Sequence, residues 1–199
     1  MLRRRPRTKP AEVRREELMD AAQALFLAKG FDAASVDQIV KAADVAKGTF
    51  YFHFKTKEAV LQALRTRFIE SFHICLEDAI NAKAPDEWVG RLDAWIGAGV
   101  NGYLDQFELH DLVFHEFRPS NRRRERDNPI VAHLASLIVS GKKAGAWKVR
   151  DARLTAVMLS NAIHGAVDDE IAAPVKSSRA RLVADVRAFC RLALGLPAK

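Results

Sequence analysis

The chain contains few of the residues that mark several large classes of protein. Its 199 residues include two cysteines, ten glycines and seven prolines, which excludes a disulfide-stapled or collagen-like chain. No apolar run approaches the roughly 20 residues that cross a bilayer, and the basic amino terminus lacks the apolar segment of a signal peptide. We therefore expect a cytoplasmic protein with no membrane partner.

Signatures of catalysis are also missing. The sequence has no phosphate-binding loop, nucleophile elbow, paired Cys-x-x-Cys or convincing histidine–carboxylate set. His110 and His115 are five residues apart, a spacing that points two ligands to different faces of a helix. Cys75 and Cys190 lie inside apolar helical patterns and are predicted to be small buried hydrophobes. We expect no enzyme, no cofactor and no metal site.

Positive charge is concentrated at the amino terminus. Residues 1–15 contain seven Lys or Arg and one acid, so this segment holds +6 of the net charge of +7. A basic arm on a nearly neutral body suits a polyanionic partner, although charge alone favours a solvated tail. The basic stretch at residues 122–126 could touch DNA or an acidic ligand, and a solvated loop is the preferred interpretation.

A helical period runs through almost every segment, without hairpin signals or sustained strand alternation. We therefore predict an all-α fold. Gly30 ends the first helix, and Ser35 with Gln38 forms a capping box for the second. The long fourth helix should bury Leu61, Leu64, Phe68, Phe72, Cys75 and Ala79. The predicted helices cover about 12–29, 36–43, 46–52, 57–79, 86–107, 111–117, 129–144, 152–172 and 178–194.

Residues 35–52 form a helix, a turn of three or four residues and a second helix, which is the helix-turn-helix plan. The second helix begins the run KGTFYFHFK at residues 47–55. Its lysines, hydroxyls and imidazole suit contact with phosphates, while Phe50 and Phe54 can anchor it inward. Taken singly, the lysines are typical of solvated surface, His53 could fill a helix junction, and Tyr51 could pack on the first helix. Their combination favours DNA.

Residues 30–64, GFDAASVDQIVKAADVAKGTFYFHFKTKEAVLQAL, resemble the DNA-binding domain of the TetR family of repressors, most specifically in KGTFYFHFKTKE. The resemblance covers about residues 10–65. It implies a two-fold dimer whose recognition helix starts at Ala46. The DNA-contacting positions that it implies are Ser35, Lys47, Gly48, Thr49, Tyr51, Phe52, His53 and Lys57. Phe52 stands where many relatives have a second tyrosine, so it can touch a thymine methyl but cannot hydrogen-bond.

The resemblance also implies three parts: a flexible basic arm at 1–10, a three-helix DNA-binding domain at 11–55 and a helical ligand-sensing and dimerisation domain at 56–199. The arm then becomes a phosphate or minor-groove clamp, and disorder off DNA is equally compatible with its sequence. The last two helices are apolar enough to form a dimer interface, although packing within one chain is also compatible with their sequences.

Large aromatic residues and glycines in the middle helices predict a ligand site, although ordinary core is the alternative for each residue. The predicted lining is Trp95, Gly99, Tyr103, Phe107, Phe114, Met158 and Asn161. Such a site suits an apolar or amphipathic molecule. We predict a repressor that releases a palindromic operator when this molecule binds. The alternative is an activator, or a regulator of the same fold without a small-molecule inducer.

Overall fold

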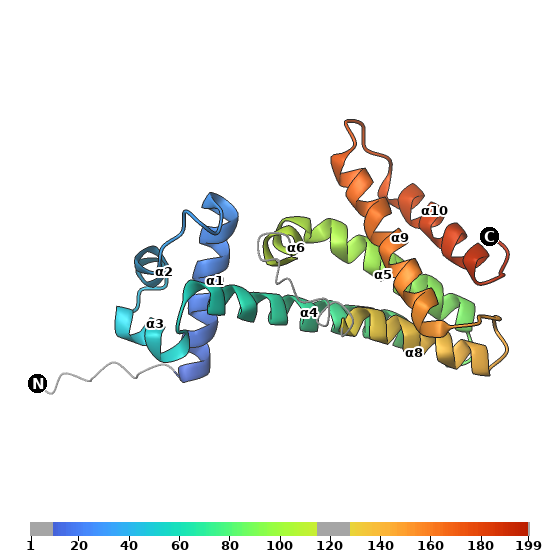
Figure 1. Ribbon diagram of the computed structural model, residues 1–199, viewed down its shortest axis with the longest axis horizontal. Helices are drawn as coiled ribbons and strands as arrows, with labels where there is room; N and C mark the ends of the chain where they lie inside the picture. The colour runs from blue at the N-terminus through green and yellow to red at the C-terminus, as the bar shows by residue number, and fades with distance from the viewer. Residues whose placement is uncertain (1–9, 115–127, 199) are drawn as a thin grey trace, which may run out of the picture. The chain divides into compact units, whose positions relative to one another are not determined.

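The computed structural model describes residues 10–114 and 128–198, whose helices are labelled in Figure 1. These ranges contain no strand, so the predicted all-α fold is confirmed. The helices are α1 (Ala11–Lys29), α2 (Val36–Ala42), α3 (Lys47–His53), α4 (Lys57–Asn81), α5 (Trp88–Asp105), α6 (Phe107–Phe114), α8 (Pro129–Lys143), α9 (Ala152–Ala172) and α10 (Arg179–Ala193). The predicted basic arm, apart from its last residue, the basic stretch at 122–126 and His115 lie outside the described residues.

The chain forms two compact units. Among the described residues, the first contains the chain up to Phe68 and the segment that starts at Glu108. The second contains residues 69–107 and the chain from 128 on. The predicted domain boundary after residue 55 falls inside the first unit, so α4 contributes to both units.

Local sequence sets the helix ends of the first unit. Gly30 follows α1 with a φ of 82° and donates its N–H to the Phe26 carbonyl at 2.8 Å. Ser35 caps α2, accepting from the Gln38 N–H while the Gln38 side chain accepts from the Ser35 N–H. Asp44, in the turn before α3, has a φ of 51°, a conformation that Asp tolerates better than most residues. These ends keep the connections between α1, α2 and α3 short, as the sequence predicts.

The core of the first unit draws on all four of its amino-terminal helices. Its fully buried large side chains include Leu18, Met19, Phe26, Ile39, Phe50, Leu61 and Leu64. Arg67 of α4 fastens to α1, with its guanidinium 2.8 Å from both Glu16 and Asp20 and 3.0 Å from the Gln23 amide oxygen. A shared guanidinium of this kind holds α4 against α1 better than an isolated surface pair would.

The buried stripe of α4 departs from the prediction in its second half. Leu76 and Ile80 are buried there, whereas Cys75 is exposed. The prediction for Cys75 was wrong because the stripe continues at four-residue steps from Phe68 and does not change to a three-residue step. Cys190 is buried as predicted, and burial, with a smaller contribution from Asp93, raises the pKa of its thiol to about 12.

The second unit is built on α5, α8, α9 and α10 around a core that includes Leu92, Ile96, Leu134, Ile138, Leu159, Val167 and Val186. Arg191 of α10 binds both carboxylate oxygens of Asp93 on α5, and the Arg187 Nε donates to the Asp93 carbonyl at 2.9 Å. Gly97 leaves space for the Arg187 side chain, since a Cβ at residue 97 would lie 2.3 Å from the Arg187 guanidinium. No described helix is both long enough and apolar enough to span a bilayer.

The break between α5 and α6 differs from the prediction. One helix was expected through Phe107 and a second from about Asp111, but α5 ends at Asp105 and α6 begins at Phe107. Gln106 separates them with a φ of −129° and a ψ of 25°. Neither glycine nor proline marks this point, so the local sequence carries no signal for the break.

Candidate nucleic-acid interface

Helix α3 has one buried face and one exposed face. Phe50 is 0% exposed and Phe54, which follows the helix, is 5% exposed, with their rings 6.0 Å apart. Both anchors are therefore confirmed. Each residue advances about 100° around a helix, so Phe52 lies about 200° from Phe50. Its ring is 78% exposed, and Gly48 lies one turn earlier on the same outward face.

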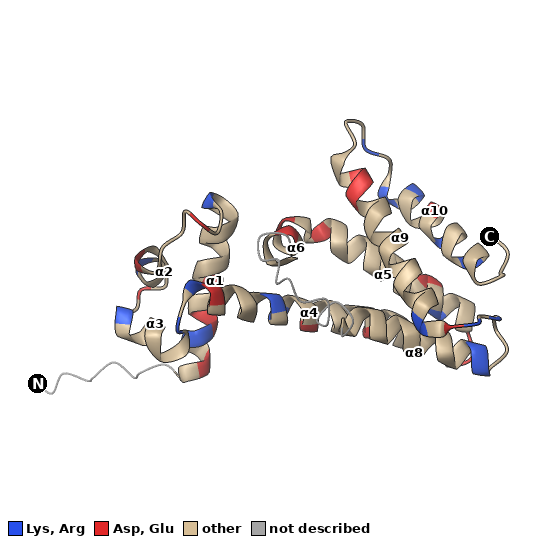
Figure 2. Ribbon diagram, in the orientation of Figure 1, with Lys and Arg blue, Asp and Glu red and all other residues tan. Residues whose placement is uncertain are grey.

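Hydrogen-bonding side chains flank this outward face on both sides. Tyr51 is 52% exposed and lies one turn after Lys47. On the other flank, the half-buried His53 lies one turn after Thr49. Figure 2 shows basic residues on α3 and in its connection to α4. The helix thus presents an apolar centre between two rows of polar groups.

Gly48 leaves an open surface on α3. A Cβ at this position would meet no atom within 4 Å, and the residue is exposed. A glycine inside a helix is less favourable than alanine by about 0.5–1 kcal/mol. Packing among the described residues of the unit therefore does not require this glycine.

Lys47 has a partner that the sequence analysis missed. Its Nζ lies 2.7 Å from Asp37 at the start of α2, and both side chains are exposed. The hydrogen bond to Asp37 raises the pKa of Lys47, so the ammonium remains charged. A phosphate or base acceptor would have to compete with this carboxylate. Asp37 directly follows the first residue of a capped helix, and only the helix-turn-helix geometry identifies it as a neighbour of Lys47.

The ammonium of Lys57 binds backbone carbonyls, whereas a phosphate ligand was expected to face solvent. Its Nζ donates to the carbonyls of Phe31, Asp32 and Ala34 at 2.8, 3.2 and 3.2 Å, and it lies 4.4 Å from the centre of the Phe31 ring. An ammonium has three donors, and all three point at the loop between α1 and α2. Ser35, in contrast, accepts from the Gln38 N–H and keeps its hydroxyl proton for another acceptor.

The predicted ligand residues do not gather around one cavity. Trp95 and Tyr103 are 3% and 4% exposed in the core of the second unit, and Gly99 packs against Leu76 and Trp95. Met158 is 56% exposed on α9. The structure therefore brings part of the predicted set into the core and leaves part of it on the surface.

The remaining members of that set are also dispersed. Asn161 is exposed and donates to the carbonyl of Val157 at 2.8 Å. Phe107, at the start of α6, is 36% exposed. Phe114 belongs to the first unit, where its ring lies 5.9 Å from Phe68 and below the Arg65 guanidinium.

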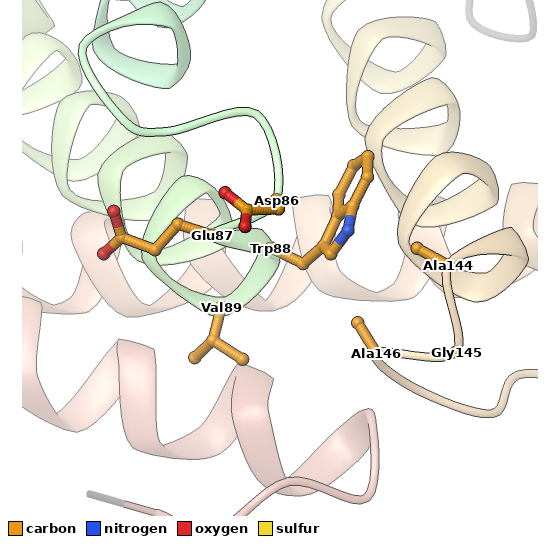
Figure 3. A pocket seen from close by; sticks show the side chains of 7 residues that line it. All are labelled: Asp86, Glu87, Trp88, Val89, Ala144, Gly145 and Ala146. Atoms are coloured by element: carbon orange, nitrogen blue, oxygen red, sulfur yellow. The ribbon is translucent and has the colours of Figure 1, made fainter.

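A pocket of the second unit lies at the start of α5, and Figure 3 labels the residues that line it. The Trp88 side chain stands between this helix and the turn that follows α8. The lining residues are Asp86, Glu87, Trp88, Val89, Ala144, Gly145 and Ala146. None of the predicted ligand residues lines it. Within residues 10–114 and 128–198, no three His, Cys, Asp or Glu side chains are grouped to hold a metal ion.

Two buried aromatic residues of α5 carry polar links to neighbouring helices. The Tyr103 hydroxyl lies 2.5 Å from the Asp168 carboxylate, and its ring is 5.1 Å from His164. The Trp95 indole N–H donates to Nδ1 of His133 at 3.3 Å. Burial, with a smaller contribution from His73, lowers the pKa of His133. These links place polar groups inside the aromatic region that the sequence analysis identified.

Helices α9 and α10 leave apolar side chains in solvent. On α9, Leu154 and Met158 are 53% and 56% exposed and lie one turn apart. On α10, Phe189 and Leu192 are 55% and 61% exposed and share a face. Large apolar side chains at helical spacing on two helices that contact each other are typical of a protein–protein interface.

Comparisons with known proteins identify the amino-terminal region. Residues 18–64 match the family described as "Bacterial regulatory proteins, tetR family". The uncharacterized HTH-type transcriptional regulator YhgD of Bacillus subtilis is 26% identical over 73% of this chain and 78% of its own length. The HTH-type transcriptional regulator SrpR of Pseudomonas putida is 44% identical, over only 27% of this chain and 25% of SrpR.

A likeness in fold alone covers most of the chain. The fatty acid degradation regulator FadR of Bacillus halodurans has a TM-score of 0.74 over 92% of this chain and 96% of FadR, at 24% identity. The fold and the exposed face of α3 define a helix-turn-helix protein. Residues 18–64 are therefore similar to the TetR family of transcriptional regulators, and the two relatives named above are HTH-type transcriptional regulators.

Proposed function

We propose that this chain is a ligand-responsive repressor. It binds a palindromic operator as a homodimer and releases the operator when an apolar or amphipathic small molecule binds its carboxy-terminal unit. The observation that carries the proposal is the outward face of α3, where Tyr51 and Phe52 are exposed and Gly48 leaves the backbone open.

The proposed DNA contacts divide by chemistry. Tyr51, Thr49 and His53 donate hydrogen bonds to phosphate oxygens, and Lys47 adds positive charge once it leaves Asp37. Ser35 donates its hydroxyl proton to a phosphate near the start of α2. Lys57 acts in a different way, because its donors hold the loop between α1 and α2 and thereby place Ser35.

The proposed homodimer uses α9 and α10. Burying Leu154, Met158, Phe189 and Leu192 against their copies would remove four large exposed side chains per protomer from water, which favours association. Binding to successive major grooves would require the two α3 helices of this dimer to lie about 34–36 Å apart.

The proposed inducer binds among α5, α8 and α9, near Trp95 and Tyr103. Ligand entry there requires the buried side chains to move, so the site opens only in a minor state that the ligand selects. The signal can reach the first unit through the chain itself, at the junction within α4 after Phe68 and at the start of α6. The B. halodurans neighbour is a fatty acid degradation regulator, so fatty acids are the first probes.

The experiment that tests this proposal selects genomic fragments with the purified protein at about 0.15 M salt, because affinity depends strongly on salt. We expect a few fragments that share a palindrome, and no enrichment with Tyr51→Ala. Fatty acids of increasing chain length are then titrated against the protein–operator complex. Release by one chain length supports an inducer, whereas random fragments would contradict sequence-specific binding.

A further inference from the structure

The structure assigns a separate role to Phe52, which rests on the proposed function: its ring reads the methyl group of a thymine in each operator half-site. The proposal begins from exposure. Phe52 is 78% exposed, more than Tyr51 at 52%, although phenylalanine has no polar group to gain from water. Among the described residues, the ring has one aromatic neighbour, His53, whose ring meets it edge-on with the centroids 4.9 Å apart.

The direction of Phe52 separates it from the phosphate-binding side chains. It lies opposite the buried Phe50, whereas Lys47 with Tyr51 and Thr49 with His53 lie on the two flanks. In a helix that enters the major groove, the flanks face the two sugar–phosphate strands and the central line faces the base edges. Phe52 is therefore placed for bases and Tyr51 for phosphates.

The groove offers one chemical partner for a phenyl ring. Donors and acceptors cover the major-groove edges of all four bases, and the C5 methyl of thymine is the apolar group among them. Gly48 allows α3 to lie closer to the bases, because the turn before Phe52 carries no side chain on this face. Apart from its chain neighbours and the backbone of α3, no described atom lies within 4 Å of the position that a Cβ of residue 48 would take. The edge-on contact with the His53 ring limits the positions of the Phe52 ring. Phe52 should therefore contact one base step and not several.

The test compares operator duplexes that differ by single methyl groups. Each thymine of the selected palindrome is replaced by uracil, symmetrically in both half-sites, and dissociation constants are measured at about 0.15 M salt. For the wild type we expect one position at which uracil weakens binding by about fourfold per methyl, the value for one buried carbon. For Phe52→Ala, thymine and uracil should bind equally at that position.

Two control variants test whether the thymine preference comes from the ring of Phe52. Tyr51→Phe should weaken binding to both duplexes by the same factor and keep the thymine preference. Phe52→Tyr retains the ring and should retain most of the preference. Because Phe52 is exposed, Phe52→Ala should melt at the wild-type temperature, which separates loss of recognition from loss of folding.

The outcomes distinguish this inference from the proposed function. Sequence-specific binding in which no thymine matters, or in which Phe52→Ala keeps the same thymine preference, would overturn the methyl contact and leave the repressor proposal intact. Failure of the wild type to select any operator would overturn both.

Discussion

Two regions of the molecule leave apolar side chains in solvent, and their surroundings differ. On α3, the exposed Phe52 is bordered by the hydroxyl of Tyr51 and the ammonium of Lys47. On α9, Leu154 and Met158 follow each other with no charged residue between them on that face. Exposure alone does not identify a partner. The polar groups beside it differ between the two helices, and this difference supports the two proposed partners, nucleic acid for α3 and a second copy of the chain for α9.

The largest expected effect comes from placing charge on the α9 surface. Met158→Asp should convert the proposed dimer to a monomer, because a carboxylate from each protomer would be buried in its apolar interface. Operator affinity should then fall about a hundredfold or more, since the second half-site no longer binds as part of the same molecule. Sedimentation and operator titration measure both effects. Val175→Asp, at a loop residue that is 82% exposed, is the matched control and should change neither.

A pair of glycine substitutions sharpens the comparison. A Cβ at Gly141 would lie 2.1 Å from the ring of Trp147, which is buried and donates to the Ile138 carbonyl. Gly141→Ala should therefore destabilise the protein by about 1–3 kcal/mol through overpacking, measured by urea unfolding. Its DNA affinity per folded molecule should be unchanged.

Gly48→Ala should have the opposite profile. Nothing obstructs the new methyl group, so stability should stay the same or rise by up to about 1 kcal/mol. The methyl group would nevertheless hold α3 away from DNA, and we expect operator affinity to fall about fivefold, near the lower limit for one lost base contact. If the affinity stays at the wild-type value, the open surface of α3 does not face DNA.

An effect of similar size is expected from Tyr51→Phe, which removes one hydroxyl and keeps the ring, whose centroid lies 5.4 Å from that of Phe50. The loss of one hydrogen bond to phosphate should weaken binding about three- to tenfold. The loss should be equal for all operator sequences, because phosphates carry no base information. Competition titrations with a mutated operator check this, and a sequence-dependent loss would assign Tyr51 to a base.

Asp37→Asn should strengthen DNA binding on the order of a few-fold, because it removes a negative charge from the surface that would approach phosphates. It also releases Lys47 from its 2.7 Å ion pair. Titrations at several salt concentrations measure the change, which should be largest at low salt. Weaker binding in this variant would mean that Asp37 positions Lys47 for a specific contact.

The smallest effect concerns pH in the second unit. Because burial lowers the pKa of His133 below its ordinary value of 6.5, the unfolded chain binds this proton more readily than the folded chain. The stabilisation is present above pH 6.5 and is lost as the pH falls through the lower, folded value. The neighbouring His73 also lowers the pKa of His133 by charge repulsion, whereas the carboxylate of Glu77 raises it.

Thermal melts between pH 7.5 and 5.5 test this expectation. His133→Asn offers the Trp95 indole an amide oxygen and cannot titrate, so its melting temperature should fall less on acidification than that of the wild type. Equal slopes for the two proteins would show that His133 does not carry the pH dependence.

Local signals explain why the first unit was predicted well. Gly30 and the Ser35–Gln38 capping box mark helix ends within a few residues, and Phe50 with Phe54 shows which face of α3 is buried. Lys57 shows the limit of such signals. Its partners are carbonyls that lie 23 to 26 residues earlier, and backbone acceptors leave no trace in residue types.

The second unit was harder to predict because its packing is non-local. Trp95 and Met158 both fit an apolar helical period, yet one is buried and the other is 56% exposed. Which face of a helix is buried depends on the neighbours that the fold brings to it. The fit of Trp147 against Gly141 depends on shape in the same way, and neither residue was singled out from the sequence.

The most direct test of the central claim is a hydroxyl-radical footprint of the protein on its selected operator. Two α3 helices in a two-fold dimer should protect two segments on one face of the duplex, with centres about one helical turn, or 10–10.5 base pairs, apart. Met158→Asp should lose the paired pattern. A single protected segment for the wild type, or protection that persists unchanged in Tyr51→Ala, would contradict the assignment of α3 as the recognition helix of a dimer.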